Sequence, residues 1–406
     1  MRTYHYSLFL TSQFYFCAFP LRLDSYNKCS FNCDYCFMKY RGGNYSQKKN
    51  IQYADTVSID KQICRALNGD TDTAIREFLY RRVPIHFGGV SDPFSDLETD
   101  YFTTKELLKI LNKYNYPTII STRSSALGDI NIISLIRSGN YIVQVSTPTD
   151  NDSNLKKLIN DEHIFLDQLK MISKLKKNSI DVVCRLQPIF PNYENEYIKI
   201  INSLMKFDVD YFVFEFYKLP FENYKRLNIL QKKLNYNLFD FYKENDAIAA
   251  GREWILPSVY KTNAIRNIIN NVEKSSKISI GYADNDLLHL NKFNCCLGPY
   301  ATKKGFENSF KYNIPMAIRK STSNNIILNS IQGEWYPKKS INRIMNSKSR
   351  IHGDDISIKD YIKRAWNSSN HLSPEFYYGI NRKQENDKAG NAVFFKSERQ
   401  EIRSET

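Results

Sequence analysis

The run CSFNCDYC at residues 29–36 brings three cysteines, Cys29, Cys33 and Cys36, into one short loop. Three thiolates at C-x3-C-x2-C spacing can hold a cubane iron–sulfur cluster at three corners and leave the fourth iron open. An open coordination position separates a catalytic metal site from a closed structural one. The loop therefore predicts chemistry at a metal centre, and the rest of the chain is interpreted around it.

Two structural explanations of the cysteines fit less well. A structural zinc site needs four ligands, usually from a second C-x2-C knuckle or a Cys/His pair, and no second knuckle follows in the sequence. A disulfide framework is typical of a much higher cysteine density than 8 in 406 residues. The remaining cysteines are scattered along the chain: Cys17, Cys64, Cys184, Cys295 and Cys296.

The residue before the third cysteine is the aromatic Tyr35, and the pattern C-x3-C-x-aromatic-C resembles the radical S-adenosylmethionine (SAM) superfamily. The resemblance implies two cofactors, a [4Fe-4S] cluster on Cys29, Cys33 and Cys36, and SAM chelated to the open iron with Tyr35 near its adenine. A low-potential cluster against a sulfonium can pass one electron and break a C–S bond. Such an enzyme also needs an electron donor such as flavodoxin or ferredoxin.

Strand and helix signals alternate along the first 220 residues. Helices are predicted after a capping box at Thr103 and Glu106, between Asp129 and Gly139, through 165–175, and after Asn192. Short runs rich in β-branched or aromatic residues predict strands at Phe14–Leu21, Pro84–Phe87, Pro117–Ser121, Tyr141–Ser146, Ile180–Leu186 and Tyr211–Phe216. Six βα units predict an α/β fold, a partial (βα)6 TIM-like barrel with a mostly parallel sheet.

Active sites of parallel barrels lie at the carboxyl ends of the strands, so the residues after each strand are the candidates. The second predicted strand runs into HFGGVSDPF at residues 86–94. Gly88 and Gly89 allow the backbone to approach a ligand closely, and Ser91 and Asp92 add an acceptor-rich pair. Ser121-Thr122-Arg123-Ser124 ends the third strand.

This series resembles the spore photoproduct lyase-like, or DNA repair photolyase-like, branch of the superfamily over roughly residues 15–220. The matching motifs are SDPF with Glu98, T-R-S at 122–124, S-T at 146–147 and R-x-x-P-I-x-P at 185–191. The resemblance implies that Ser91 and Arg123 bind the methionine carboxylate and that Ser146 lies near the ribose. The full set of implied cofactor-binding residues is Tyr35, Gly88, Gly89, Ser91, Asp92, Arg123, Ser146 and Arg185.

The chain also departs from true photoproduct lyases. Those enzymes carry a hydrogen-donor cysteine where this chain has Gly89, and a tyrosine where it has Phe37. The resemblance therefore favours the fold and radical initiation more than thymine-dimer repair. The vicinal pair Cys295-Cys296 is a candidate replacement donor in the catalytic role, although it could also hold a second metal or pack in the core.

Composition is consistent with a large enzyme. A 406-residue chain with 42% hydrophobic residues can fill a sizeable core. It contains no run of 18 apolar residues, which predicts no membrane span, and polar residues interrupt its aromatic first twenty positions, which argues against a signal peptide. Reduced ligand cysteines predict the cytoplasm. The net charge of +14 is compatible with a nucleic-acid partner, and equally with a Lys- and Asn-rich composition bias.

The organisation changes near residue 250. We expect a radical SAM core domain at 1–250 and a mixed α/β extension at 251–406, in which Lys277–Ala283 could add a strand and the last fifteen or so residues are solvated and poorly ordered. The leading hypothesis is a radical SAM enzyme acting on nucleic acid. The alternatives are radical modification of a peptide or small metabolite, and a non-enzymatic iron–sulfur regulator that binds DNA. SAM cleavage separates the enzymes from the regulator, and nucleic-acid affinity separates the two enzymes.

Overall fold

The computed structural model describes most of the chain. The described ranges are 3–4, 7–39, 50–146, 164–221, 224–273, 277–293, 295–321, 324–331, 334–341, 356–370, 372–378 and 380–396.

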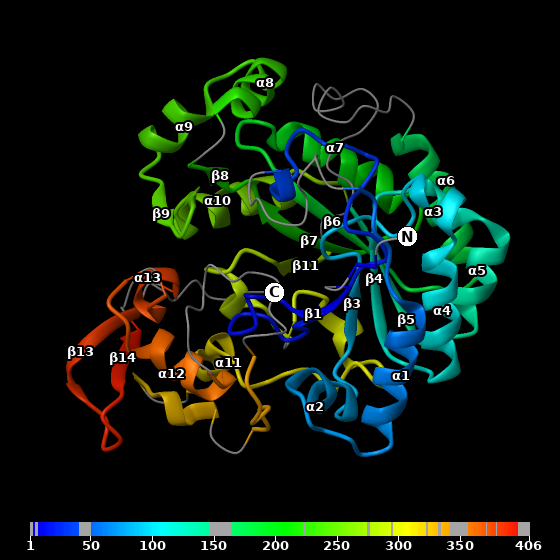
Figure 1. Cartoon of the computed structure of the whole chain (residues 1–406). Helices are drawn as coiled ribbons and strands as arrows, with labels where there is room; N and C mark the ends of the chain where they lie inside the picture. The colour runs from blue at the N-terminus through cyan, green and yellow to red at the C-terminus, as the bar shows by residue number, and fades with distance from the viewer. Residues whose placement is uncertain are drawn as a thin grey trace.

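An eight-stranded sheet forms the centre of the molecule (Figure 1). Its strands lie in the order β1-β2-β3-β4-β5-β6-β7-β11; β1 pairs antiparallel to β2, and every later pair is parallel. The bounds are β1 (Leu8–Leu10), β2 (Leu21–Leu23), β3 (Ile85–Phe87), β4 (Thr118–Thr122), β5 (Tyr141–Ser146), β6 (Val182–Ile189), β7 (Tyr211–Phe216) and β11 (Ser279–Tyr282). This mostly parallel α/β sheet agrees with the predicted fold class, with eight strands in place of six.

The two faces of the sheet have separate cores because alternate residues of a strand point to opposite sides. Ile120, Val143 and Cys184 belong to the large core between the sheet and the helices, whereas Ile142 and Val183 belong to a smaller core inside the curved sheet. In Figure 1 helices cover the outer side of the sheet. The helices up to β7 are α1 (Thr56–Leu67), α2 (Ala74–Tyr80), α3 (Leu97–Tyr101), α4 (Thr103–Lys113), α5 (Ile130–Arg137), α6 (Ile164–Lys177) and α7 (Glu194–Met205), with 3-10 turns η1 (Phe37–Lys39) and η3 (Ser125–Gly128).

The start of α4 differs from the predicted capping box. Thr103 is the first residue of α4 and Phe102 precedes it, with φ 52°. The cap comes from Glu98, whose carboxylate oxygens accept from the backbone N–H groups of Thr104 (2.8 Å) and Lys105 (2.9 Å). A carboxylate satisfies the unpaired N–H groups of a first helical turn more strongly than a threonine hydroxyl, which explains the exchange.

The expected first strand at Phe14–Leu21 is wrong. Residues 12–16 form turns, and the strand is the later β2. The aromatic side chains that suggested a strand pack instead against the carboxyl-terminal part of the chain: Phe14 and Tyr15 contact Tyr361, with ring centroids 5.1 and 5.5 Å apart, and Phe16 contacts Tyr377 at 4.9 Å. Long-range packing therefore overrides the local β propensity here.

The chain segment that connects β7 to β11 forms a second group of elements, at the upper left of Figure 1. It contains the three-stranded sheet β8-β10-β9 and the helices α8, α9 and α10. The bounds are β8 (Leu219–Pro220), α8 (Tyr224–Leu234), α9 (Leu238–Glu244), β9 (Ile248–Ala250), β10 (Glu253–Ile255) and α10 (Ser258–Asn270).

The boundary expected at residue 250 stays a prediction, and one strand of the main sheet, β11, lies beyond it.

A third sheet, β12-β14-β13, and helices follow at the lower left of Figure 1. Their bounds are η6 (Leu288–Leu290), η7 (Gly298–Thr302), α11 (Ile314–Lys320), β12 (Asn325–Ile326), η8 (Leu328–Ile331), α12 (Ile358–Asn367), α13 (Pro374–Tyr378), β13 (Ile380–Asn386) and β14 (Ala392–Lys396).

The predicted solvated tail is wrong for its first residues. β14 is the middle strand of the third sheet, and Ala392 and Phe394 are fully buried. The Trp366 indole N–H donates to the Ala392 carbonyl (2.7 Å), and its ring packs against Phe394. Residues 397–406 lie outside the described part of the chain. Within the described residues, no helix is both long enough and apolar enough to cross a membrane.

Candidate functional site

A cavity of about 330 Å³ opens at the carboxyl ends of the parallel strands. It reaches from the cysteine loop, across the strand ends of β3 to β7, to β8 and β10. Its lining includes every cofactor and metal residue that the sequence predicted: Cys29, Cys33, Tyr35, Cys36, Gly88, Gly89, Ser91, Asp92, Arg123, Ser146 and Arg185. The strand-end rule therefore located the cavity correctly; the role of each residue remains a prediction.

The cysteine loop follows β2 and forms one end of this cavity. The Ser30 hydroxyl accepts from the backbone N–H of Asp96 (3.1 Å), and Asp34 forms an ion pair with Lys233 of α8. Burial, and then the nearby Asp92 carboxylate, raise the pKa of the Cys29 thiol, so a metal would have to displace its proton.

The donor set fits an iron–sulfur cluster. Three thiols, those of Cys29, Cys33 and Cys36, come from one loop at the end of the cavity. In a cubane cluster each of three thiolates binds a different iron, and the fourth iron stays open.

Arg123 lies beside this loop and is 7% exposed. Its Nη1 donates to the Tyr35 hydroxyl (2.7 Å) and contacts the Cys33 sulfur. Its guanidinium also lies 5.7 Å from the ring centroids of Phe31 and Tyr35. The Nε and Nη2 atoms are buried without a hydrogen-bond partner.

Gly88 and Gly89 form the tight turn after β3. Gly88 has φ +91°, and a Cβ there would lie 2.4 Å from the carbonyl oxygen of Ser121, so only glycine fits without moving the backbone. At Gly89 a Cβ would lie 2.8 Å from Cδ of Arg22. The aliphatic part of Arg22 therefore fills the space that a side chain at residue 89 would use.

Two carboxylates, those of the buried Asp24 and the partly buried Asp92, hold the turn that follows. Asp24, directly after β2, accepts from the backbone N–H groups of Val90 (2.8 Å) and Ser91 (3.1 Å). The Ser91 hydroxyl donates to the Tyr26 carbonyl (2.7 Å). Asp92 accepts from the Thr122 hydroxyl and the Arg123 backbone N–H, both at 2.7 Å. Asp92 thus ties the turn to the end of β4, a structural contribution in addition to its expected role near the cofactor.

Replacing Asp24 should change how stability depends on pH. Burial, opposed by hydrogen bonds from Val90 and Ser91, raises the pKa of Asp24 from 3.8 to about 7. The unfolded chain therefore loses this proton near pH 4 and the folded chain near pH 7, so the free energy of unfolding falls as pH rises between them, by about 4 kcal/mol at most.

Asp24→Asn keeps the accepting oxygen and removes the titration, so its unfolding free energy should vary less between pH 4 and 7 in urea titrations. Asp129→Asn is the matched control, because Asp129 caps α5 through Asn131 and Ile132 at an exposed position. An unchanged pH profile in Asp24→Asn would contradict the assigned burial cost.

A polar row crosses the floor of the cavity, with one side chain from each of five consecutive strands: His86, Ser121, Gln144, Arg185 and Glu215. Each member contacts the next. His86 Nε2 and Ser121 Oγ are 2.6 Å apart, Ser121 Oγ donates to Gln144 Oε1 (3.0 Å), and Arg185 Nη1 donates to the same oxygen (3.2 Å). The row places hydrogen-bonding groups where a parallel barrel carries its chemistry.

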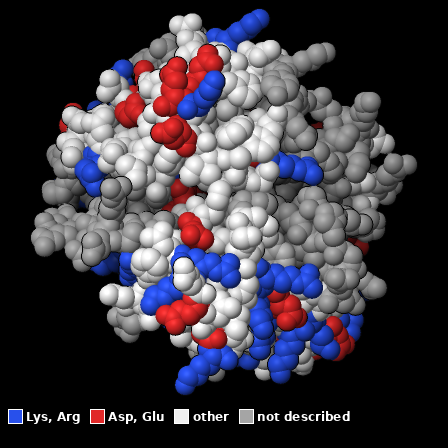
Figure 2. All heavy atoms as spheres, turned by 90° about the vertical axis from the view of Figure 1, so that its left-hand side faces the viewer, with Lys and Arg blue, Asp and Glu red and all other residues white. Residues whose placement is uncertain are grey.

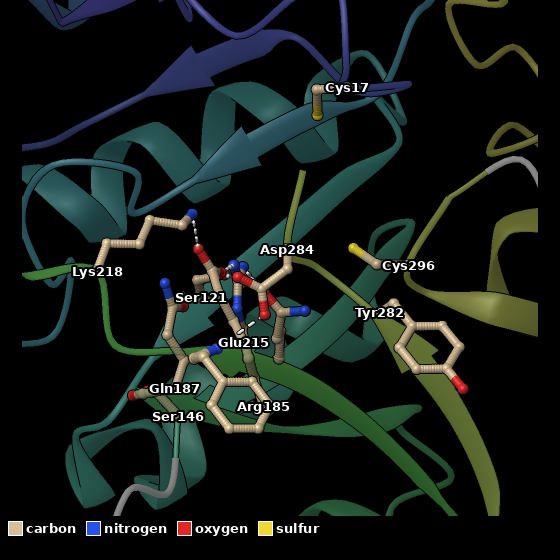
Figure 3. Close-up of polar contacts among 12 residues, drawn as sticks. Cys17, Ser121, Ser146, Arg185, Gln187, Glu215, Lys218, Tyr282, Asp284 and Cys296 are labelled. Atoms are coloured by element: carbon tan, nitrogen blue, oxygen red, sulfur yellow. Dashed lines mark hydrogen bonds and ion pairs between the residues drawn. The ribbon is translucent and has the colours of Figure 1, made fainter. Parts of the chain in front are cut away.

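The row ends in an ion-pair group, shown in Figure 3. Arg185 Nη2 pairs with one oxygen of Glu215, and Lys218 Nζ donates to the other (2.8 Å). Burial alone would raise the pKa of Glu215, but the charges of Lys218 and Arg185 outweigh it and lower the pKa to about 2. Burial, with the charges of Arg22 and Arg185, lowers the pKa of His86, which is therefore neutral.

Sequence reasoning missed several of these residues. Arg22, His86, Gln144, Glu215 and Lys218 line the cavity and were not predicted as site residues. The available signal was strand alternation: polar residues at inward positions of strands that are otherwise apolar are candidates for a cavity floor. Arg185, predicted to bind the cofactor, contacts Gln144 and Glu215, and its buried Nε lacks a partner; its role at the cofactor stays a prediction.

The pair Cys295-Cys296 lies outside the cavity lining. The two sulfur atoms are 3.8 Å apart, and the Cys296 carbonyl accepts from the hydroxyl of Tyr211 (2.8 Å), the first residue of β7. The Cys296 carbonyl also lies against Gly281 of β11, where a Cβ would approach it to 2.2 Å, and Gly281 pairs with Val213 in the middle of β7. The hydrogen bond with Cys295 outweighs burial, with help from the Arg185 charge, and lowers the pKa of Cys296 to about 7. Its hydrogen-donor role stays a prediction.

Comparisons with known proteins agree with this arrangement. No family model and no curated protein matches the chain. Solved structures do. Spore photoproduct lyase complexed with dinucleoside spore photoproduct matches at 12% identity over 67% of this chain and 79% of its own, with a TM-score of 0.50. A mutant of that enzyme with bound AdoMet and the dinucleoside matches at 10% identity over 66% and 79%, TM-score 0.48. SuiB of Streptococcus suis bound to S-adenosylmethionine matches at 16% identity over 56% and 48%, TM-score 0.37.

The chain has the fold of a radical SAM enzyme. The particular fold that it matches is that of spore photoproduct lyase, which confirms the sequence resemblance at the level of the fold.

Proposed function

We propose that this protein is a radical SAM enzyme. The observation that carries the proposal is one cavity at the strand ends of this fold, lined by Cys29, Cys33 and Cys36 and by the half-partnered guanidinium of Arg123. When bound, a [4Fe-4S] cluster and SAM supply one-electron reductive cleavage of the sulfonium to methionine and a 5′-deoxyadenosyl radical.

The chain's own residues would bind and orient these groups. The three thiolates hold the cluster, the Gly88-Gly89 turn lets the backbone approach the cofactor, and the buried Arg123 edge donates to its carboxylate. Tyr35, whose ring packs edge-on to Phe190 at 6.2 Å, gives the adenine an aromatic surface. Ser146, at the end of β5, is proposed near the ribose.

The test is SAM cleavage by the anaerobically reconstituted, reduced protein. We expect 5′-deoxyadenosine and methionine in equal amounts, measured by chromatography and mass spectrometry. A full cluster without any cleavage under strong reductant would refute the enzyme and favour the iron–sulfur regulator. In the cell, flavodoxin or ferredoxin is the proposed electron donor, and an oxygen-sensitive cluster favours the cytoplasm as the proposed location.

We propose nucleic acid as the substrate class. Two observations support it: the net charge of +14, and a fold match to an enzyme solved with a dinucleoside. Figure 2 shows the side of the molecule that carries α9 and β13; Lys and Arg gather over its lower part, mixed with Asp and Glu, while acidic residues gather near the top. The lower part is therefore the face on which phosphate contacts would be sought.

Binding to nucleic acid should weaken steeply with salt. Each phosphate neutralised by Lys or Arg releases counterions, so the logarithm of the affinity should fall linearly with the logarithm of salt concentration. The measurement is fluorescence anisotropy with labelled single- and double-stranded DNA and RNA between about 50 and 200 mM salt. If no binding is detected at the lowest salt, the substrate is a peptide or small metabolite, the second enzyme class considered.

A further inference from the structure

We propose that Arg123 joins the cluster to the cofactor, so that its charge sets the reduction potential of the cluster while its free edge binds the cofactor. The proposal rests on the proposed function and deepens it. It assigns Arg123 a position beside the cluster ligand Cys33, which the sequence resemblance did not imply.

The guanidinium of Arg123 has two different edges in this structure. Nη1 is occupied by the cluster loop, through Cys33 and the hydroxyl of Tyr35. Nε and Nη2, whose N–H groups point in parallel from the other edge, are buried without partners. Buried donors are nearly always paired in proteins, and two parallel N–H groups match the two oxygens of a carboxylate.

The charge of Arg123 is only partly compensated, by the nearby Asp92 carboxylate. Among the described residues, no ion pair joins its guanidinium to a carboxylate. The carboxylate oxygens of Asp92 accept hydrogen bonds from the Thr122 hydroxyl and from the backbone N–H groups of Phe94 and Arg123. The charge therefore acts on the cluster loop, in surroundings where little water screens it.

The side chain is fixed by contacts on both flanks of its backbone. Asp92 accepts from the Arg123 N–H, and Gln168 of α6 donates to the carbonyls of Arg123 (2.6 Å) and Ser146 (3.1 Å). The rings of Phe31 and Tyr35 hold the guanidinium plane. Arg123 is thus a rigidly placed cation against a cluster ligand.

A cation and an N–H donor beside a ligand sulfur stabilise the more negative, reduced cluster and raise its reduction potential. A cofactor carboxylate bound at the opposite edge would be attracted by the same positive charge. Removing the charge should therefore make the cluster harder to reduce and also weaken cofactor binding.

The experiment compares wild type, Arg123→Gln, Arg123→Lys and the control Arg185→Gln, all reconstituted anaerobically. The midpoint potential is measured without SAM by redox titration followed by electron paramagnetic resonance. We expect a clear shift to more negative potential in Arg123→Gln and a smaller one in Arg123→Lys, which keeps the charge. Arg185→Gln removes the same charge from the same cavity, from a residue already paired with Glu215, and should shift the potential less than Arg123→Gln does.

SAM binding is the second measurement, by equilibrium dialysis. Loss of a charge-assisted bidentate contact should weaken binding about 10- to 100-fold in Arg123→Gln. An unchanged potential in Arg123→Gln, or equal shifts in Arg123→Gln and Arg185→Gln, would overturn the proposal. If Arg123→Gln takes up no cluster, Arg123→Lys decides it, and a wild-type potential together with wild-type affinity in that variant counts against it.

Failure of the two proposals can be told apart. If wild type binds a cluster but does not cleave SAM, the proposed function fails, whatever Arg123→Gln does to the potential. If wild type cleaves SAM and the potentials of wild type and Arg123→Gln coincide, the enzyme stands and the role of Arg123 beside the cluster fails.

Discussion

Alanine at Cys29, Cys33 or Cys36 should abolish the iron–sulfur cluster and, with it, all SAM cleavage. Each thiolate binds a different iron, so loss of one thiolate leaves a second iron without its protein ligand. Wild type should bind one brown four-iron cluster per chain after anaerobic reconstitution. Iron and sulfide analysis and the visible spectrum check this directly, and each single variant should lose nearly all of the signal.

Alanine at both Cys295 and Cys296 is the matched control, because this pair lies outside the lining of the cavity that holds the three loop cysteines. That double variant should retain the full iron content. If it lost half of the iron, a second cluster would exist. Zinc in place of iron after anaerobic purification would contradict the assignment of the loop itself.

The strands of the sheet were predictable because their signal is local and redundant. Tyr211–Phe216 was predicted with the bounds that β7 has, and Tyr141–Ser146 with those of β5, since both are runs of β-branched and aromatic residues buried on both faces. The strand-end rule then placed the candidate residues on one cavity without any knowledge of their contacts.

The failures came from partners that the local sequence pattern does not include. Phe14 to Phe16 carry a strand-like pattern, but their rings are used to bind the carboxyl-terminal helices α12 and α13. Thr103 matches a capping box, but a carboxylate five residues earlier, Glu98, takes its place. Only folding brings α12 and α13 close to these rings. Glu98 is near Thr103 in the sequence, but the capping-box pattern does not include its position.

The residues that line the cavity could be predicted only in part. The glycines and cysteines are recognised from their spacing in the sequence, whereas the polar row can be recognised only when it is known which face of each strand points inward. Glu215 sits in the run YFVFEF, where a single acid is easily assigned to a solvent face. Its partner Arg185 comes from β6, and only the register of the sheet brings it to Glu215. Its other partner, Lys218, lies three residues after Glu215 in the chain.

A second large effect is expected from the missing hydrogen donor. The reduced wild-type protein with SAM should not restore thymines from dinucleoside spore photoproduct above the level of a SAM-free control. Repair of that lesion requires a hydrogen atom to be returned to the product radical, and a thiol is the usual donor. Among the described residues that line the cavity, the thiols are the three proposed cluster ligands.

Structural detail explains why neither the two positions of the usual relay nor Cys184 fills the gap. Arg22 occupies the space beside Gly89, and Phe37 lacks the phenol that would relay a hydrogen atom. Cys184 is fully buried in the core between the sheet and the helices, so it faces away from the cavity.

Efficient repair by wild type, measured by chromatography of the released dinucleotide, would contradict the prediction. If that repair then disappeared in Cys296→Ala, the vicinal pair would be the displaced donor. If it persisted, Cys296 would not be the donor, and Cys295→Ala would test Cys295 in the same way.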